Sequence, residues 1–423
     1  MSRANSFSLR SSLAGPARYR TAVTLVLALV ALVGYGLYTV QSIRARGLFD
    51  YVGVDFRTYY ASGLILREHG AGAVYDLSLQ TAYQKALYDQ FAIYVKDNSL
   101  PYYVIPTPYP PIYVLLFSLL SVFPPLFAFL VWEGLNIILF LVYSITWVKR
   151  LNLKWLEGLG LVAMLFLSVQ NFHNLFSAQV NLFLMISIGE TLFNVIQKRN
   201  MAAGICLSLG LLKPHAILLM VLLFLVLRKW RLIFGFLISA TAMILASLAM
   251  LSYQGTLNYI EMLSSYDPLL RLGGMTWMSL VDNLTLLGLQ RPTAFVIGGG
   301  MALVVLMAWA YILWQMRRYP SDEAAWDEVF LLTSATQAIV APHGYVYMAL
   351  MLGVPWLVYV NRHNDTITWL AFLTWGIGLG LIFIAIAQKS LGNAVFILGM
   401  FTLMMHVFIM LLVYENWKAK TQH

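Results

Sequence analysis

The chain has few charged residues and almost no cysteine. Asp, Glu, Lys and Arg make up 11% of the 423 residues, whereas a soluble domain averages about 25%. Hydrophobic residues make up 60%, so the composition predicts an all-α polytopic membrane protein. The one cysteine, Cys206, lies in an apolar run and excludes an intrachain disulfide framework.

Several patterns that carry known chemistry are also absent. The sequence has no P-loop, no Rossmann glycine pattern, no His-Glu-x-x-His and no cluster of Cys and His. The first loop lacks a paired Asp-x-Asp, so neither a divalent metal ion nor another cofactor is indicated. The net charge is +9, but the basic residues stand in pairs between apolar runs. That pattern is typical of cytoplasmic membrane loops and predicts no nucleic-acid partner.

The apolar runs predict about twelve full membrane crossings and one partial helix. The run 112–123 rises only about 18 Å, short of the roughly 30 Å hydrocarbon core, so we expect it to enter and leave from one side. The first run lacks a convincing signal-peptide cleavage site. The predicted spans are 21–40, 126–148, 155–168, 180–196, 202–212, 216–227, 232–251, 293–314, 329–341, 345–359, 367–387 and 394–414.

This arrangement places the basic clusters on one side of the membrane, which the positive-inside rule makes the cytoplasm. We expect a single domain, 1–423, in the cell membrane (plasma or inner), with both termini cytoplasmic and a tail at 1–20. The large external loops are then 41–111 and 253–292. One alternative is that 202–227 forms a single kinked crossing, which would place four basic clusters outside.

The first external loop carries the first acid after a span, Asp55, next to Arg57. The spacing of apolar residues predicts amphipathic helices at the interface over 55–67 and 77–95, and prolines predict an extended segment over 101–111. A carboxylate near lipid can be tuned by burial and by a neighbouring cation to accept a proton. The alternative is that Asp55 caps the helix it begins.

Lys213 lies between two predicted short helices, so it should lie within the depth of the membrane, where an ionisable residue is costly and marks a cavity. With His215, and with Arg57 from the first external loop, it would bind the phosphate of an anionic headgroup, unless the lysine extends to the interface. His343 would contact the same phosphate or orient the base; a buried, hydrogen-bonded histidine is the alternative.

A further set of polar and aromatic residues suits sugar recognition. Gln179 and Asn181 would hydrogen-bond sugar hydroxyls or cap the following span. The aromatic candidates would stack on sugar rings, although tyrosine and tryptophan also form interfacial belts without a ligand. These candidates are Tyr59, Tyr60, Tyr109 and Trp277.

Short motifs follow one another between about residues 50 and 345, and together they resemble glycosyltransferase family 87. These are GT-C-fold mannosyltransferases that use polyprenyl-phosphate mannose, including the phosphatidylinositol-mannoside enzymes. Ala178 departs from the pattern, since a glycine is common there; Trp277-Met278-Ser279-Leu280 and Val346 also depart. The motifs are Asp55-Phe56-Arg57-Thr58-Tyr59-Tyr60-Ala61-Ser62-Gly63, Val74-Tyr75-Asp76, Tyr109-Pro110-Pro111, Gln179-Val180-Asn181, Leu211-Leu212-Lys213-Pro214, Arg228-Lys229-Trp230-Arg231 and Ala341-Pro342-His343.

The resemblance implies an inverting glycosyltransferase that needs no metal ion. Asp55 would be the catalytic base, His343 a required residue of the site, and Lys213 the residue facing the donor phosphate. Its partners would be a polyprenyl-phosphate sugar, a lipid or glycan acceptor and membrane lipids. A transporter or flippase of lipid-linked sugars, which would have paired broken helices in its two halves, and a non-catalytic binder of such sugars are the competing hypotheses.

Overall fold

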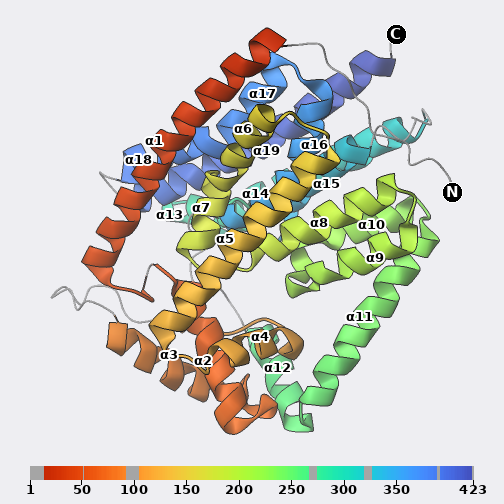
Figure 1. Cartoon of the computed structure of the whole chain (residues 1–423). Helices are drawn as coiled ribbons and strands as arrows, with labels where there is room; N and C mark the ends of the chain where they lie inside the picture. Colours follow the sequence, from red (N-terminus) through yellow and green to blue (C-terminus); the bar gives the residue numbers. More distant parts are fainter. Residues whose placement is uncertain are drawn as a thin grey trace.

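A computed structural model describes residues 14–50, 52–91, 104–265, 274–318, 326–387 and 391–421. Within these ranges the chain is helical, and its only β contacts are isolated bridges. Figure 1 shows long helices side by side, with the short helices α2, α3, α4 and α12 gathered at one end. The prediction of an all-α chain is confirmed. Most of the predicted tail at 1–20 lies outside the described residues.

The helices are α1 (Ala14–Arg46), α2 (Val54–His69), α3 (Leu77–Phe91), α4 (Pro111–Leu120), α5 (Pro125–Arg150), α6 (Trp155–Phe166), α7 (Val169–Phe176), α8 (Asn181–Ile196), α9 (Asn200–Ser208), α10 (Leu218–Val226), α11 (Trp230–Met250), α12 (Tyr253–Ser265), α13 (Trp277–Leu286), α14 (Arg291–Arg318), α15 (Trp326–Val340), α16 (Gly353–His363), α17 (Thr366–Leu373), α18 (Leu379–Ala387) and α19 (Leu391–Thr421). Short 3-10 turns are η1 (Ala71–Ala73), η2 (Leu209–Leu212), η3 (Pro214–Ala216) and η5 (Val346–Leu352), while η6 (Thr374–Gly378) is π-helical.

Local sequence explains where several helices begin. α4 and α5 each start with a proline, Pro111 and Pro125, which suits the first helical position because it has no N–H to leave unpaired. Ser168 and Asp365 cap α7 and α17 by accepting a backbone N–H with their side chains. α4 has 10 residues and is therefore about 15 Å long, too short to cross a membrane.

The described residues include six helices long and apolar enough to cross a membrane. α6 and α7, bent by 52° at their junction, would make a seventh if they form one span. The multi-pass prediction is confirmed, but the other predicted spans form shorter helices, so the number twelve stays a prediction. The six are Tyr19–Arg46, Pro125–Arg150, Trp230–Met250, Arg291–Met316, Thr366–Ala387 and Phe396–Ala419.

α9 and α11 run parallel in close contact. Gly204 in α9 approaches the Leu232 carbonyl near the start of α11 so closely that no Cβ would fit. One turn further along, Ser208 donates a hydrogen bond to Ser239 at 2.7 Å. The starts of α9 and α11 therefore lie side by side. Since α10 connects the end of α9 to the start of α11, it must run antiparallel to α9. Residues 200–227 therefore form a hairpin with Lys213 at its turn, not a single kinked crossing.

The first helix predicted in the loop, α2, is buried within the protein. Every residue from 56 to 63 is buried, and α3 and α4 pack against it. Gly63 lies so close to the Phe117 carbonyl of α4 that a Cβ would overlap it. The helix was predicted correctly, but protein covers it over residues 56–63; its placement at the lipid interface stays a prediction. The second predicted helix is α3, and residues 92–95 of that prediction lie outside the described residues.

An extended segment, residues 104–110, lies between α3 and α4, as the prolines predicted; residues 101–103 lie outside the described residues. The Gln84 side chain pairs with both backbone groups of Ile105, donating at 2.8 Å and accepting at 3.1 Å. The Gln80 side chain accepts from the Thr107 N–H at 3.0 Å. Two buried glutamines of α3 thus hold the segment in place.

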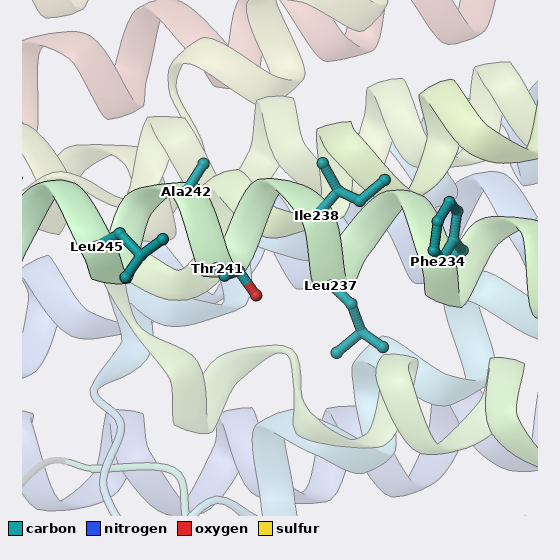
Figure 2. A pocket seen from close by; sticks show the side chains of 6 residues that line it. All are labelled: Phe234, Leu237, Ile238, Thr241, Ala242 and Leu245. Carbon is teal, nitrogen blue, oxygen red and sulfur yellow. The ribbon is translucent and has the colours of Figure 1, made fainter.

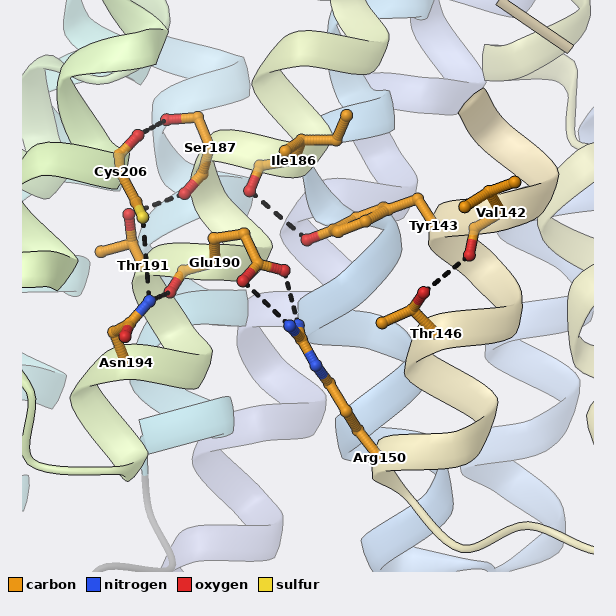
Figure 3. A network of polar contacts seen from close by, with 10 residues as sticks. All are labelled: Val142, Tyr143, Thr146, Arg150, Ile186, Ser187, Glu190, Thr191, Asn194 and Cys206. Atoms are coloured by element: carbon orange, nitrogen blue, oxygen red, sulfur yellow. Dashed lines mark hydrogen bonds and ion pairs between the residues drawn. The ribbon is translucent and has the colours of Figure 1, made fainter. Parts of the chain in front are cut away.

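The start of α1 and the ends of α5 and α16 lie at the end of the bundle opposite α2 (Figure 1). Figure 3 shows Arg150, the last residue of α5, paired with Glu190 of α8 through two contacts of 2.5 and 3.1 Å. Arg362 pairs with Asp327 at 2.6 Å, and Arg20 donates to the Asn364 carbonyl at 3.0 Å. These contacts join helices far apart in sequence.

Candidate active site

The loop between α7 and α8, residues 177–180, is bound to the start of α2. The Asp55 N–H donates to the Ser177 carbonyl at 3.1 Å, and the Trp132 indole donates to the Ala178 carbonyl at 3.1 Å. Ala178 has a φ of +59°, a left-handed conformation that favours glycine. This geometry explains why glycine suits the position where the chain has alanine.

The side chain of Gln179 is the centre of a buried polar cluster. Its Nε2 donates to Oδ2 of Asp55 at 2.5 Å. Its Oε1 accepts from Lys213 Nζ at 2.8 Å and from the Tyr59 hydroxyl at 3.2 Å. The Tyr59 hydroxyl also lies 2.9 Å from that of Tyr109. One carboxamide thus connects a carboxylate with an ammonium group, and four segments of the chain meet in this cluster.

Lys213 is buried and points into this cluster from the turn of the α9–α10 hairpin. Besides Gln179, its ammonium donates to Asn181 Oδ1 at 3.0 Å and lies 4.9 Å from the centre of the Tyr347 ring. Asn181 is held in turn by Asn174, whose Oδ1 accepts from the Asn181 N–H at 3.0 Å. The ammonium is therefore held inside the protein instead of extending towards a membrane interface.

Asp55 does not cap α2. The residue at the N-cap is Gly53, in a left-handed conformation, and the Asp55 side chain turns towards Gln179 instead. Burial raises the pKa of Asp55 to about 6, against the opposing effects of Lys213, the Gln179 amide and Arg57. A carboxyl group with such a pKa can both accept and release a proton near neutral pH.

The pKa of Lys213, which lies outside the six candidate spans, is lowered by burial to about 8, against the opposing effect of Asp55. Near neutral pH the lysine is therefore still mostly a cation. The site thus offers a proton acceptor and a positive charge, held apart by the carboxamide of Gln179.

Two histidines lie beside this cluster. The rings of His215 and His343 are 6.2 Å apart, and the His215 carbonyl accepts from the Gln337 side chain at 2.7 Å. Burial, followed by the charges of Lys213 and His343, lowers the pKa of His215 to about 3. His215 is therefore neutral near pH 7 and would meet a phosphate as a hydrogen-bond donor, without a charge.

His343 is linked to the lysine through aromatic rings. Its ring lies 5.2 Å from that of Tyr345, which lies 5.5 Å from Tyr347, the ring beneath Lys213. The structure thus brings together Asp55, Tyr59, Tyr109, Gln179, Asn181 and Lys213 by direct contacts, with His215 and His343 adjoining them.

Three predicted site residues make their main contacts elsewhere. Arg57 is buried, donates to the Phe49 carbonyl at 3.0 Å and lies over the Tyr88 ring. The Tyr60 hydroxyl donates to the Phe123 carbonyl at 2.7 Å. The third, Trp277, packs edge-on against Phe295 of α14 with ring centres 5.4 Å apart. The contacts of all three hold helices and turns together.

Sequence reasoning missed Tyr347, Asn174 and Gln337. Gln337 had a usable signal, because a polar residue inside a predicted apolar span is costly and needs a partner. For Tyr347 and Asn174, the only signal in the sequence was their closeness to His343 and Gln179. Among the residues that the structure describes, no three His, Cys, Asp or Glu side chains gather in a way that would hold a metal ion.

The fold and the site define a multi-pass, all-helical membrane protein with a buried carboxylate–carboxamide–ammonium cluster. The family profile described as Glycosyltransferase family 87 matches residues 107–342, more than half of the chain. The chain therefore belongs to glycosyltransferase family 87 and is a glycosyltransferase. The matched region contains Tyr109, Gln179 and Lys213; it begins after Asp55 and ends one residue before His343. No curated protein and no solved structure matches the chain.

Proposed function

We propose that the chain transfers a sugar, mannose by preference, from a polyprenyl-phosphate donor to a hydroxyl of a lipid or glycan acceptor, with inversion at the anomeric carbon. Membership of the family supports a glycosyl transfer. The observation that carries the rest is the contact of Gln179 with both Asp55 and Lys213. It provides a base for the acceptor and a positive charge for the departing phosphate at one place.

In this mechanism Asp55 is the general base. Gln179 orients the carboxylate through Oδ2, and Oδ1 receives the proton of the acceptor hydroxyl. The acceptor oxygen then bonds to the anomeric carbon as the bond from that carbon to the phosphate oxygen breaks, and polyprenyl phosphate leaves with the bonding electrons. General base catalysis of this kind contributes about 10²–10⁴-fold in rate.

Lys213 stabilises the charge that grows on the departing phosphate. Preorganised charges and donors of this sort usually supply the largest part of a rate enhancement. His343 and the neutral His215 contribute as hydrogen-bond donors to the same phosphate. Tyr59, Tyr109 and Asn181 bind hydroxyls of the sugar or the acceptor. We propose no metal ion and no other cofactor in these steps.

We also propose on which side of the membrane the site lies. The site faces the outside of the cell membrane, both termini lie in the cytoplasm, and the donor reaches the site laterally from the outer leaflet. The predicted grouping of basic loops supports this orientation, because such loops favour the cytoplasm. The gathering of Arg20, Arg150 and Arg362 at the end opposite Asp55 supports it as well.

Transfer of labelled mannose from polyprenyl-phosphate mannose, in liposomes, tests the proposal. We expect transfer by the wild type and a loss of about 10²–10⁴-fold in Asp55→Asn, with the fold and the binding of donor lipid retained. The matched control is Asp89→Asn, which changes an exposed carboxylate of α3 paired with Lys85; it should transfer normally.

Transfer that survives in Asp55→Asn would reject Asp55 as the base. If the wild type binds donor lipid but transfers nothing to any lipid or glycan acceptor, the catalytic proposal fails. Transport of the lipid-linked sugar would then be tested in the same liposomes.

A further inference from the structure

α12 carries three distinct faces along its 13 residues. One face is apolar and exposed, one is polar, and the third packs against η1 and the segment around Tyr75. The exposed apolar face comprises Tyr253, Leu257, Ile260 and Leu263, which are 41–81% exposed. The polar face comprises Gln254, Asn258 and Glu261. An amphipathic helix with such faces is typical of one that lies in the plane of a membrane surface.

The position of α12 in the chain supports the same placement. It follows α11, a candidate span of 21 residues, after only Leu251 and Ser252. α11 exposes apolar side chains along its length, including Phe234, Leu237, Ile238 and Leu245 around the shallow pocket in Figure 2. Because a span ends at the membrane surface and only two residues separate the helices, α12 begins at that surface.

The inner face of α12 contacts the segment that carries Tyr109. The Tyr259 hydroxyl donates to the Pro108 carbonyl at 3.2 Å, and its ring lies 4.4 Å from the ring of Tyr75. The Tyr75 hydroxyl donates to the Tyr109 carbonyl at 2.6 Å. The carbonyls of Pro108 and Tyr109 thus accept hydrogen bonds from Tyr259 and Tyr75, two side chains that contact each other. The Tyr109 hydroxyl in turn contacts Tyr59 of the polar cluster.

We propose that α12 lies on the membrane with its apolar face among lipid acyl chains, and that its opposite face holds Tyr109 in position at the site. Tyr259 is then a positioning residue, because it acts through Tyr109 without touching the substrate. The lipid part of this inference rests only on the exposed faces and the continuity with α11. The positioning part rests on the proposed function.

Fluorescence quenching tests the lipid contact. In a Cys206→Ser background, single cysteines at Leu257, Ile260 or Glu261 carry a bimane label in liposomes. We expect a nitroxide on the lipid acyl chains to quench labels at Leu257 and Ile260 more strongly than the label at Glu261, and aqueous iodide to show the opposite order. Equal access of all three to iodide would overturn the proposal. Protection of Leu257 and Ile260 from both quenchers would also overturn it and indicate that a protein surface, such as a second copy, covers the face.

Steady-state kinetics test the positioning role. Tyr259→Phe removes one hydroxyl and should raise KM for the substrate that Tyr109 contacts by up to about fivefold, the equivalent of one neutral hydrogen bond, with kcat unchanged and at most a small fall in the melting temperature. Tyr253→Phe, which removes an exposed hydroxyl of the same helix, is the matched control and should behave as wild type. In a double-mutant cycle, Tyr259→Phe should have little further effect once Tyr109→Phe is present.

Unchanged kinetics in Tyr259→Phe, or additive effects with Tyr109→Phe, would overturn the positioning role. Absence of transfer by the wild type would overturn the proposed function and the positioning role together. The quenching result would still decide whether α12 contacts lipid.

Discussion

Asp55 and Lys213 contact opposite ends of one carboxamide, that of Gln179. The amide nitrogen donates to the carboxylate at 2.5 Å and the lysine donates to the amide oxygen at 2.8 Å. A direct ion pair between Asp55 and Lys213 would make the carboxylate a weaker base and would screen the positive charge of the ammonium. With the amide between them, the carboxylate is oriented and the ammonium remains a local positive charge. Gln179 therefore governs the state of both groups in the proposed mechanism.

Replacement of Gln179 by Glu should lower transfer at neutral pH. The new carboxylate would attract Lys213 but repel Asp55 and could not donate to it when ionised, so the pKa of Asp55 should rise by about one unit or more. The acidic limb of the kcat/KM profile should shift to higher pH by that amount. Gln90→Glu, an exposed change on α3, is the control. An unshifted limb in Gln179→Glu would contradict the role given to the carboxamide.

The wild-type enzyme should show a bell-shaped dependence of kcat/KM on pH. Burial raises the pKa of Asp55 to about 6, so transfer falls as the pH drops below that value and the base becomes protonated. Burial lowers the pKa of Lys213 to about 8, so transfer also falls as the pH rises above that value and the ammonium loses its charge. Lys213→Gln should lower transfer at every pH and remove the alkaline limb. A profile without an acidic limb would argue against Asp55 as the base.

Arg57→Gln should destabilise the protein without changing the KM for the donor. The guanidinium is buried, donates to the Phe49 carbonyl and lies over Tyr88, and losing a charged hydrogen bond costs about 1.5–3 kcal/mol. The residual activity after heating, measured in detergent, reports the loss. Arg67→Gln changes an arginine of the same helix that donates to the Ser121 carbonyl but is exposed, and it should cost less because water can replace the lost donor. A raised donor KM with normal stability would favour the phosphate-binding role predicted from sequence.

Ala178→Gly should be better tolerated than the same change at Ala128. Both alanines are fully buried, so both variants lose a buried methyl group and gain backbone freedom when unfolded. Only Ala178 has a left-handed φ, +59°, and relief of that strain contributes about 1–2 kcal/mol. Thermal unfolding of the two variants should differ by about that free energy. Equal losses would contradict the strained geometry of the loop.

Gly63→Ala should separate α2 from α4. A Cβ at Gly63 would overlap the Phe117 carbonyl, and overpacking of this kind costs about 1–3 kcal/mol. Gly134→Ala in α5 is the matched control, because a Cβ there would meet no atom within 4 Å and alanine favours the helix. We expect a lower melting temperature and reduced transfer in Gly63→Ala alone. Similar behaviour of the two variants would refute the close packing of α2 on α4.

Some of these features were accessible from sequence and others were not. The spacing of apolar residues predicted α2 as a helix, but it could not reveal that α3 and α4 pack against that helix or that every residue from 56 to 63 is buried. The sequence therefore placed Arg57 and Tyr60 in the site, whereas the structure shows them bonded to the Phe49 and Phe123 carbonyls. For a polar residue, the sequence shows which hydrogen bonds and charge interactions the side chain can make. It does not show which partner the side chain has in the folded protein.

The sequence by itself determined the membrane class, the helical fold, the break at Lys213 and the family. Each of these depends on composition or on residues close together in the chain. Only the tertiary structure decided that the break is a hairpin and that Gln179 joins Asp55, 124 residues away, to Lys213, 34 residues away. Such contacts depend on how helices pack. The parallel packing of α9 and α11 determines where the hairpin turn with Lys213 lies. The binding of the α7–α8 loop to the start of α2 brings Gln179 to Asp55, so that both charged groups contact one amide.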